Sequence, residues 1–441
     1  MPPPQEDEIS ARTVPVSSIP DLTNKEKTTL YGVSMGHRIG QSMIFSFLSY
    51  YGVSLGASPI EQSILVSTRN LGSNIFQTIW GRLADRAGRK PFIIIGLIVL
   101  AITTFSAVAI ARSPFDLVII SLAMTTCGFM FIPAWSALLG DYSEESNRGT
   151  FIGQVGSFGT YLSVPVIVAV GLTMDLFFQD PKSGNIGAYW IPFGLSSTVF
   201  LITAGIALFL NEKYSRLEYN KKTSKDSLSI LDLIRQNHSF SRLLTIDAFF
   251  KFSMSLAWPV FPYVALKVAN SWLELSFLWA VFNFPRALGQ AYGGRYADRY
   301  GKKRVLMISR IIYFTVPGLY FLGMFADAFI FLFIGGITGG FALGGEEVSI
   351  ISYSLDCSTE ETKATYYSIL LFTEGWVMFT GSILAGIIMS VLQTIGIGFE
   401  AVLLFMLAMI TLLRILFALL HFFLDSTPTP PVLIKEILSL T

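Results

Sequence analysis

Charged side chains inside otherwise apolar segments are the residues of this 441-residue chain best placed to do chemistry. Each costs at least about 2.5 kcal/mol at the centre of a bilayer, so a charge kept there is a functional candidate. The bases are Arg38, Arg69, Lys251 and Arg286, and the acids are Glu346, Glu347 and Glu374. The acids could bind and release protons, and the arginines could receive an anionic or strongly polar solute. The alternative is that acids and bases pair as structural salt bridges.

The three acids are candidate proton-coupling sites, but they cannot all face one point. Adjacent helical residues point about 100° apart, so Glu346 and Glu347 lie on different faces. We favour Glu346 as the one that faces the site. Charged residues nearer the ends of apolar segments are expected to extend to the membrane interface instead. These residues are Asp175, Asp247 and Arg414.

Polar residues recur at matching positions in two apolar segments that lie 213 positions apart. Asn70 matches Asn283. Gln77 matches Gln290, whereas Arg286 has no charged counterpart. Positions three and four apart share a helix face, so each segment presents a polar stripe that must face a partner helix or water. A dry interface between helices would fit the amides but fits Arg286 poorly, and we predict a central aqueous cavity. The predicted substrate-binding residues are Arg38, Gln41, Arg69, Asn70, Gln77, Lys251, Asn283, Arg286 and Gln290.

Two further stretches repeat at nearly the same spacing. GRLADRAGRK (81–90) and GRYADRYGKK (294–303) share seven of ten residues. DYSEESNRGT (141–150) aligns in the same way with DCSTEETKAT (356–365). Repetition at a fixed offset indicates that the chain consists of two related halves.

The elements that carry these residues are expected to be transmembrane helices. The chain is 52% hydrophobic and 14% charged, whereas soluble chains have about a quarter of charged residues. Uncharged runs such as 92–111 and 117–140 have the length of a helix that spans a bilayer. The alternating segments of a transmembrane barrel do not occur. The net charge of +1 gives no case for nucleic acid, and the two cysteines do not indicate a disulfide framework.

We predict an all-α polytopic membrane protein with two six-helix halves. The twelve helices are expected at roughly 29–55, 59–83, 91–111, 114–140, 150–175, 188–210, 244–268, 272–296, 304–326, 328–353, 364–392 and 396–422. The first, second, seventh, eighth, tenth and eleventh are rather polar for such helices. The domains are a cytoplasmic tail (1–28), the N-terminal half (29–210), a linker (211–243), the C-terminal half (244–422) and a second tail (423–441). The linker contains a short amphipathic helix, SLSILDLIRQ (227–236). Basic residues gather in the loops on one side, which places both termini in the cytoplasm.

The repeated loops resemble a signature of the major facilitator superfamily, a Gly, then Asp-Arg, then Gly-Arg-Lys between the second and third helices. The resemblance covers about residues 29–422, and it implies a twelve-helix fold with a substrate site between pseudo-symmetric halves. It also implies that Asp85 faces the N-terminal end of the eleventh helix, where the helix dipole favours an anion. Arg86 would then pair with Asp141, and such contacts would latch the cytoplasmic side.

By symmetry, Asp298 would face the fifth helix and Arg299 would pair with Asp356. The alternative is that these basic residues only fix the topology, but a topology signal needs neither the aspartates nor the glycines. The predicted gating residues are Gly81, Asp85, Arg86, Gly88, Arg89, Asp141, Gly294, Asp298, Arg299, Gly301 and Asp356.

The sequence also departs from subgroups of this family. Drug–proton antiporters carry an arginine in the fourth helix, where this chain has Met124, and a Gly-Pro pair in the fifth, which it lacks. Nitrate transporters carry an arginine in the second and in the eighth helix, which Arg69 and Arg286 resemble, although the two do not align at the 213 offset.

The sequence therefore predicts a secondary active transporter that moves a small polar or anionic solute by alternating access, coupled to protons. The alternatives are drug or metabolite efflux by proton antiport, and a transporter-like sensor that binds a solute without moving it. The chain has no nucleotide-binding GxxxxGK[ST] loop, and no metal or nucleophile cluster suggests an enzyme. We expect a monomer in the plasma membrane, surrounded by the lipid bilayer, with a small-molecule substrate, protons as coupling ion and no cofactor.

Overall fold

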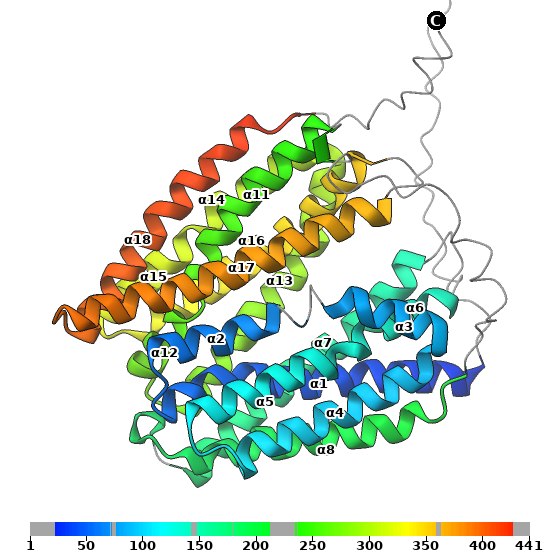
Figure 1. The fold of residues 1–441 in the computed structure, drawn as a ribbon, viewed down its shortest axis with the longest axis horizontal. Coiled ribbons are helices and arrows are strands. Elements are labelled where there is room, and N and C mark those ends of the chain that lie inside the picture. Colours follow the sequence, from blue (N-terminus) through cyan, green and yellow to red (C-terminus); the bar gives the residue numbers. More distant parts are fainter. Residues whose placement is uncertain are drawn as a thin grey trace, which may run out of the picture.

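The computed structural model describes residues 23–70, 72, 76–142, 148–178, 180–211, 234–235, 237–358 and 363–426. These residues form helices and connecting turns, without a strand among them. Figure 1 shows two groups of helices, one from each half of the chain, which meet at one end and diverge toward the other. The predicted tails and the linker helix at 227–236 lie outside the described residues, apart from a few positions.

Each half is built from long helices. The N-terminal half contains α1 (Asn24–Ser54), α2 (Pro59–Asn70), α3 (Gln77–Ala87), α4 (Arg89–Ala109), α5 (Pro114–Cys127), η2 (Gly128–Met130), α6 (Phe131–Tyr142), α7 (Arg148–Phe177), η3 (Pro181–Ser183), η4 (Ile186–Tyr189) and α8 (Trp190–Ala207). The C-terminal half contains α11 (His238–Ala257), α12 (Val260–Val268), α13 (Trp272–Tyr300), α14 (Lys302–Tyr313), α15 (Thr315–Ala326), α16 (Phe329–Asp356), α17 (Lys363–Thr394), α18 (Phe399–Leu419) and η5 (Leu420–Phe423).

Helices occupy all twelve predicted positions in the described part of the chain, four of them as consecutive pairs (α2 and α3, α5 and α6, α11 and α12, α14 and α15). Nine of these positions are long and apolar enough to cross a membrane by length and composition. The other three are the first, second and eighth, which are among the six helices that were predicted to be rather polar. The first helix begins at Asn24, five residues earlier than predicted, because Thr23 and Glu26 form a capping box.

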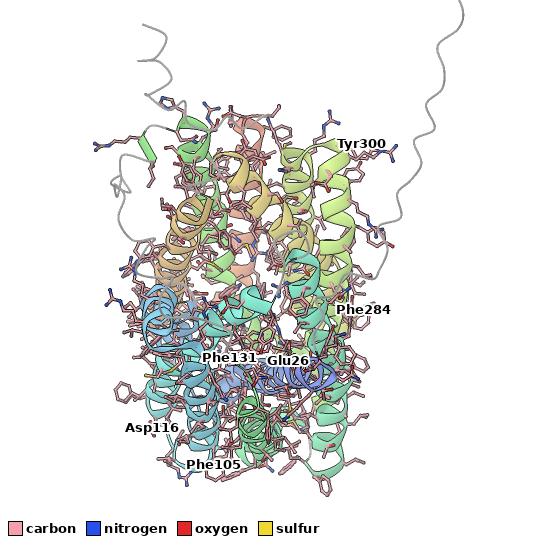
Figure 2. All side chains as sticks on the ribbon, turned by 90° about the vertical axis from the view of Figure 1, so that its right-hand side faces the viewer. Glu26, Phe105, Asp116, Phe131, Phe284 and Tyr300 are labelled. Carbon is pink, nitrogen blue, oxygen red and sulfur yellow. The ribbon has the colours of Figure 1, made fainter. Side chains whose placement is uncertain are left out.

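The outer surface of the bundle is apolar. Phe105 and Phe284 are 50% and 51% exposed and point outward from the perimeter, whereas Phe131 lies inside at 1% exposure (Figure 2). A soluble protein seldom exposes so many large apolar side chains, whereas lipid solvates them. The chain is an integral membrane protein.

Two helix breaks in the C-terminal half are held by a buried arginine. Pro317 has no N–H to donate to the Tyr313 carbonyl, and the N–H of Trp258 turns to Ser255, which frees the Met254 carbonyl. Arg414 donates to both freed carbonyls, at 3.2 Å and 3.4 Å. It is fully buried, so the prediction that Arg414 extends to the membrane interface is wrong.

Glycines bring α13 and α16 into backbone contact. A Cβ on Gly340 would lie 2.0 Å from the Phe282 carbonyl oxygen, and one on Gly344 would lie 2.1 Å from that of Arg286. The partner helix contributes Gly289, whose added Cβ would lie 2.1 Å from the Phe341 carbonyl oxygen. Small residues at such spacing let membrane helices approach closely. This crossing fixes the position of Arg286 on α13 relative to α16.

The two halves touch at the end of the molecule opposite the repeated loops. Asp175, at the end of α7, accepts hydrogen bonds from the backbone N–H groups of Trp272 (2.7 Å) and Leu273 (3.0 Å), which begin α13. Lys182 donates to Asn270 at 2.9 Å, and Tyr263 donates to the Ala57 carbonyl at 2.7 Å. These hydrogen bonds join the halves in the described part of the chain. Asp175 thus caps a helix of the opposite half, where the helix dipole favours its charge, a role that the sequence did not predict.

We expect Gly340→Ala to destabilise the protein, because its methyl group would meet backbone that cannot move aside. Overpacking of this kind costs about 1–3 kcal/mol, and the melting temperature of the detergent-purified protein should fall. Gly194→Ala is the matched control, since a Cβ there would meet nothing within 4 Å. An equal effect of the two substitutions would contradict the close crossing.

We expect Asp175→Asn to loosen the joined end, since the neutral amide loses a charge-assisted pair of hydrogen bonds worth about 1.5–3 kcal/mol. Ser63→Cys can report this opening, because Ser63 is buried at the interface against Gly386. Labelling of the introduced thiol by a membrane-impermeant reagent added outside should speed up about tenfold for each 1.4 kcal/mol lost.

The labelling background is low once Cys127 is replaced by serine. Burial and the neighbouring Asp356 raise the pKa of the Cys357 thiol to about 12, so this thiol reacts slowly. Asp327→Asn, on the exposed turn between α15 and α16, is the matched control. An unchanged labelling rate in Asp175→Asn would show that this contact does not hold the end closed.

Candidate functional site

A cavity of about 780 Å³ lies between the two halves. Helices of both halves line it, namely α1, α2, α5 and α7 from one side and α11, α12, α13, α14, α16 and α17 from the other. The predicted site residues on its wall are Arg38, Gln41, Arg69, Asn70, Lys251, Asn283, Arg286, Gln290, Glu347 and Glu374. The side chain of Gln77 is outside the described ones, and Glu346 is not on the cavity wall.

Arg286 and Glu347 form a bidentate pair on the cavity wall. The guanidinium Nε donates to Glu347 Oε2 at 3.0 Å, and an Nη2 hydrogen bond to Oε1 completes the fork. Gln290 adds a third hydrogen bond to Oε2 at 2.9 Å. Such charge-assisted pairs are strong and directional, so Glu347 serves here as the fixed partner of an arginine.

A second group of charges is buried inside the C-terminal half. Arg310 of α14 is ion-paired with Asp247 of α11 and, at 3.0 Å, with Oε1 of Glu346 of α16. Lys251 of α11 lies 2.9 Å from the same Glu346 oxygen and 3.6 Å from Oε1 of Glu374 on α17. We call these five residues the buried ion cluster. Only Lys251 and Glu374 reach the cavity wall.

The cluster corrects two predictions. Glu346 was favoured as the acid that faces the site, but its side chain is fully buried behind the wall and Glu347 faces the cavity. Asp247 was expected to extend to the interface, but it is 2% exposed and paired with Arg310.

Sequence reasoning missed Arg310 and its neighbour His421, whose Nε2 lies 2.7 Å from Arg310 Nη1. Arg310 follows the basic run at the start of the ninth helix, and no role was predicted for it from the sequence. The signal that could have found it is distance along the helix. Arg310 lies eight residues after Lys302, which is about 12 Å into the membrane at 1.5 Å per residue.

The N-terminal half contributes only positive charge among the described residues on the cavity wall. Arg38 of α1 and Arg69 of α2 are both exposed, and both line the cavity. The Arg69 guanidinium lies 4.6 Å from the centre of the Phe45 ring, a cation–π contact. Among the described carboxylates, none forms an ion pair with Arg38.

The repeated loops form the same ion pair in each half, but with different partners from those predicted. Asp141 pairs with Arg89 rather than Arg86, and Asp356 pairs with Lys302, at 2.5 Å, rather than Arg299. The glycine before each cation explains this. Gly88 and Gly301 adopt φ of 99° and 97°, which glycine tolerates, so the next residue starts a new helix directed at its own half.

The predicted contacts between the loop aspartates and the opposite half are not formed here. Asp298 is exposed and has no hydrogen bond or ion pair with a described residue, and the Asp85 side chain is outside the described ones. Since the halves diverge at this end (Figure 1), the latch role of Asp85 and Asp298 stays a prediction for the conformation in which this end is closed.

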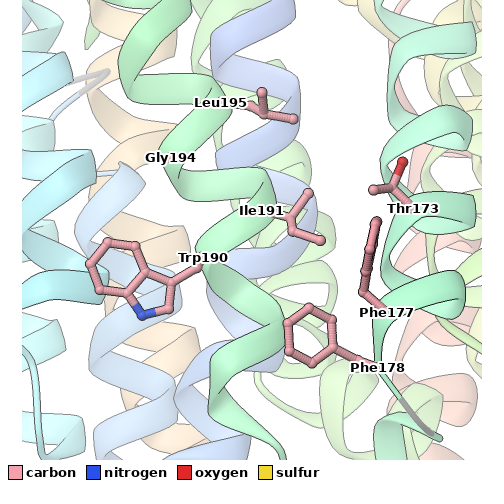
Figure 3. Close-up of a pocket in the computed structure, with 7 residues that line it drawn as sticks. All are labelled: Thr173, Phe177, Phe178, Trp190, Ile191, Gly194 and Leu195. Carbon is pink, nitrogen blue, oxygen red and sulfur yellow. The ribbon is translucent and has the colours of Figure 1, made fainter.

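A second hollow lies on the outer surface, between α7 and α8. It measures about 660 Å³ and is lined by Thr173, Phe177, Phe178, Trp190, Ile191, Gly194 and Leu195 (Figure 3). Its lining offers one hydroxyl and no charge. Among the described residues, no group of His, Cys, Asp and Glu could hold a metal ion. The charges converge on the central cavity, which is the candidate site.

The family model of the Major Facilitator Superfamily matches residues 30–250 and 243–438. The chain belongs to this superfamily of transporters. It is similar to a multi-drug resistance efflux pump PmrA homolog of Lactococcus lactis, with 23% identity over 292 residues, which cover 62% of this chain and 67% of that protein. It is also 31% identical over 172 residues to the inner membrane transport protein YajR of Escherichia coli, covering 38% of this chain and 34% of that one.

Solved structures share the fold. The nucleoside transporter NupG superposes with a TM-score of 0.71 and 15% identity, covering 90% of this chain and 99% of NupG. A bacterial homolog of the lysosomal transporter Spinster, in an inward-facing and unoccupied conformation, gives a TM-score of 0.68 at 16% identity, covering 92% of this chain and 98% of that one.

We expect Arg310→Met to destabilise the protein strongly, because Asp247 and Glu346 would lose the cation between them while remaining buried. Removing one partner of a buried ion pair costs about 3–5 kcal/mol. Thermal unfolding in detergent measures this cost. Arg304→Met, an exposed arginine on the same helix, is the control and should leave the melting temperature unchanged. Equal melting temperatures of both variants would show that the cluster does not need Arg310.

Proposed function

We propose that the protein moves a small polar or anionic solute across the membrane by alternating access, and that Glu374 carries the coupling proton. The observation that supports this most directly is the position of the Glu374 carboxylate. It lies on the cavity wall, and its nearest base is Lys251 at 3.6 Å.

The charge balance of the buried ion cluster singles out Glu374. The cluster holds three carboxylates and two bases, so it has a net charge of −1 when all five are ionised. Asp247 and Glu346 pair with the fully buried Arg310, and one proton on Glu374 makes the cluster neutral. Lys251 lies between Glu346 and Glu374, and its ammonium can strengthen either contact as the proton arrives or leaves.

The conformation supports alternating access. The halves are joined at the end opposite the repeated loops, and they diverge at the loop end. With the loops in the cytoplasm, as the basic residues predict, this is an inward-facing state. The aspartates of the repeated loops would then close the cytoplasmic end in the opposite state, as predicted from the motif.

We place the transporter in the plasma membrane as a monomer, surrounded by the lipid bilayer. We propose that it has a small-molecule substrate, the proton as coupling ion, and neither a cofactor nor an enzymatic activity.

A second candidate is efflux driven by proton antiport. Two relatives favour it, the multi-drug resistance efflux pump PmrA homolog and an MdtL multidrug resistance protein of Shewanella that is 24% identical over 329 residues. Met124 in the fourth helix and the fifth helix without Gly-Pro count against it. Export of lipophilic cations from energised cells would support this candidate over the first.

We expect Glu374→Gln to flatten the pH dependence of transport, since the amide cannot exchange a proton. The test is solute flux into proteoliposomes with and without an imposed pH gradient. The wild type should respond to the gradient, and the variant should catalyse only exchange that is independent of it. Glu400→Gln is the matched control, because Glu400 is an exposed partner of Lys267 and does not line the cavity. A variant that still follows the gradient would remove Glu374 from the proton path.

A further inference from the structure

The described side chains that line the cavity carry an excess of positive charge. Four bases line it (Arg38, Arg69, Lys251 and Arg286) and two acids (Glu347 and Glu374). Glu347 is held by the bidentate fork of Arg286, and Glu374 faces Lys251. Even with both acids ionised, these lining side chains carry two more positive than negative charges.

The positive charges act on one another across the cavity. Arg38 is under the opposing fields of Arg286 and Glu347, and Arg69 is under the fields of Arg286 and Arg38. Like charges repel strongly where the surrounding dielectric is low. An anion that enters between them relieves this repulsion, whereas a cation would add to it.

Aromatic side chains also line the cavity, from both halves. Trp258, Phe261, Trp279 and Phe282 line it from the C-terminal half, and Phe45 and Tyr50 line it from α1. Aromatic side chains offer large apolar faces for ring stacking. A solute that satisfies both the cations and the aromatic rings needs an oxyanion group and a flat apolar body.

Resting on the proposed function, we infer that the substrate is an aromatic organic anion that binds through Arg38 and Arg69 and is carried together with the proton of Glu374. The oxyanion, a carboxylate, sulfonate or phosphate, lies at the two arginines of the N-terminal half. The ring lies against the tryptophans of the C-terminal half. Proton and anion move in the same direction.

The sign of the coupling follows from charge. A proton on Glu374 removes one negative charge from the wall, so the positive excess at the cavity grows by one. An anion then binds more tightly, and by reciprocity the bound anion favours the proton on Glu374. For a lipophilic cation the same argument gives the opposite sign, so each partner weakens the other. The direction of this linkage therefore separates symport of an anion from antiport of a cation.

The titratable groups that act on Glu374 enter this linkage. They are Lys251 and Asp247 on α11, Glu346 on α16, Arg310 on α14 and Tyr367 on α17 itself. The other helices packed against α17 carry Arg69 (α2), Glu347 (α16) and Arg414 (α18). Arg414 donates to main-chain carbonyls, and Arg310 is shared between Asp247 and Glu346. Lys251 is the base nearest to Glu374, so the proton changes the charge at the cavity surface rather than deep in the half.

The test uses the full-length protein in detergent and four matched probes. 2-Naphthalenesulfonate and 2-naphthoate are aromatic anions, 2-naphthamide is their neutral counterpart, and tetraphenylphosphonium is a lipophilic cation. Both anions should bind and compete with each other, and their affinity should rise about 5- to 100-fold between pH 8 and pH 6. Because the sulfonate does not titrate in this range, proton uptake on binding, measured as a pH rise in weak buffer, must come from the protein.

Substitutions test the anion-binding role of Arg38 and the proton-binding role of Glu374 separately. Arg38→Gln should lose about 10- to 100-fold in anion affinity, since a charge-assisted contact is removed, while Arg38→Lys should retain most of it. Glu374→Gln should bind the anions tightly at every pH, without proton uptake. Arg304→Gln and Glu400→Gln are the controls and should bind like the wild type.

Three outcomes of the binding experiment would contradict different parts of this inference. Binding of tetraphenylphosphonium alone, or of no probe, would overturn the anionic substrate. Anion binding that weakens at low pH, or that releases protons, would overturn the common direction but leave Glu374 as a proton carrier. Anion binding that does not depend on pH, in the wild type and in Glu374→Gln alike, would remove Glu374 from coupling and overturn the proposed function with it.

Discussion

The C-terminal half is organised around one constraint. Its buried charged side chains must be neutralised by other side chains, because water does not reach them. Arg310 is fully buried and cannot lose its proton, so carboxylates must surround it. Asp247 and Glu346 meet this need from two different helices, and Lys251 extends the same group to the cavity. The helices that carry these residues are therefore fixed relative to one another by electrostatics as well as by apolar packing. The one acid left over, Glu374, is the one that solvent can reach.

The close crossing of α13 and α16 provides a second fixed element. Backbone contact through glycines leaves little freedom to slide, so Arg286 and Glu347 meet in a defined geometry. The Arg286 and Glu347 side chains therefore hold fixed positions on the cavity wall of the C-terminal half. In the N-terminal half, Arg38 and Arg69 lie exposed on the wall of the same cavity. The solute therefore meets the fixed Arg286–Glu347 pair on the side of the C-terminal half and the more accessible arginines on the side of the N-terminal half.

Much of the fold could be predicted from the sequence, because apolar runs, repeats and basic loops each have one physical cause. The central cavity and most of its predicted polar residues were also accessible, since a polar stripe must face something other than lipid. The ion-pair partner of each charged residue could not be predicted from the sequence. Whether Asp141 meets Arg86 or Arg89 depends on the helix restart after Gly88, which shifts the direction of one side chain. The roles of Glu346 and Glu347 depend on a helix rotation that composition does not fix.

Buried charges near helix ends were misjudged for a related reason. Two residues, Asp247 and Arg414, lie at positions from which a side chain can reach water, and only tertiary partners decide whether it does. Each of them instead satisfies a group that another element leaves open, a buried guanidinium or the carbonyls freed at helix breaks. Sequence gives the cost of burying such a charge, but the compensating partner lies far along the chain.

The hydrogen bonds that join the halves at one end make each half a lever. The 30 residues of α7 span about 45 Å, so a rotation of about 10° about the joined end displaces its far end by about 8 Å. Near the pivot, the same rotation moves atoms by about an ångström. A rigid rotation is thus enough to open or close a passage the width of an aromatic ring, and no helix needs to unfold for the solute to pass.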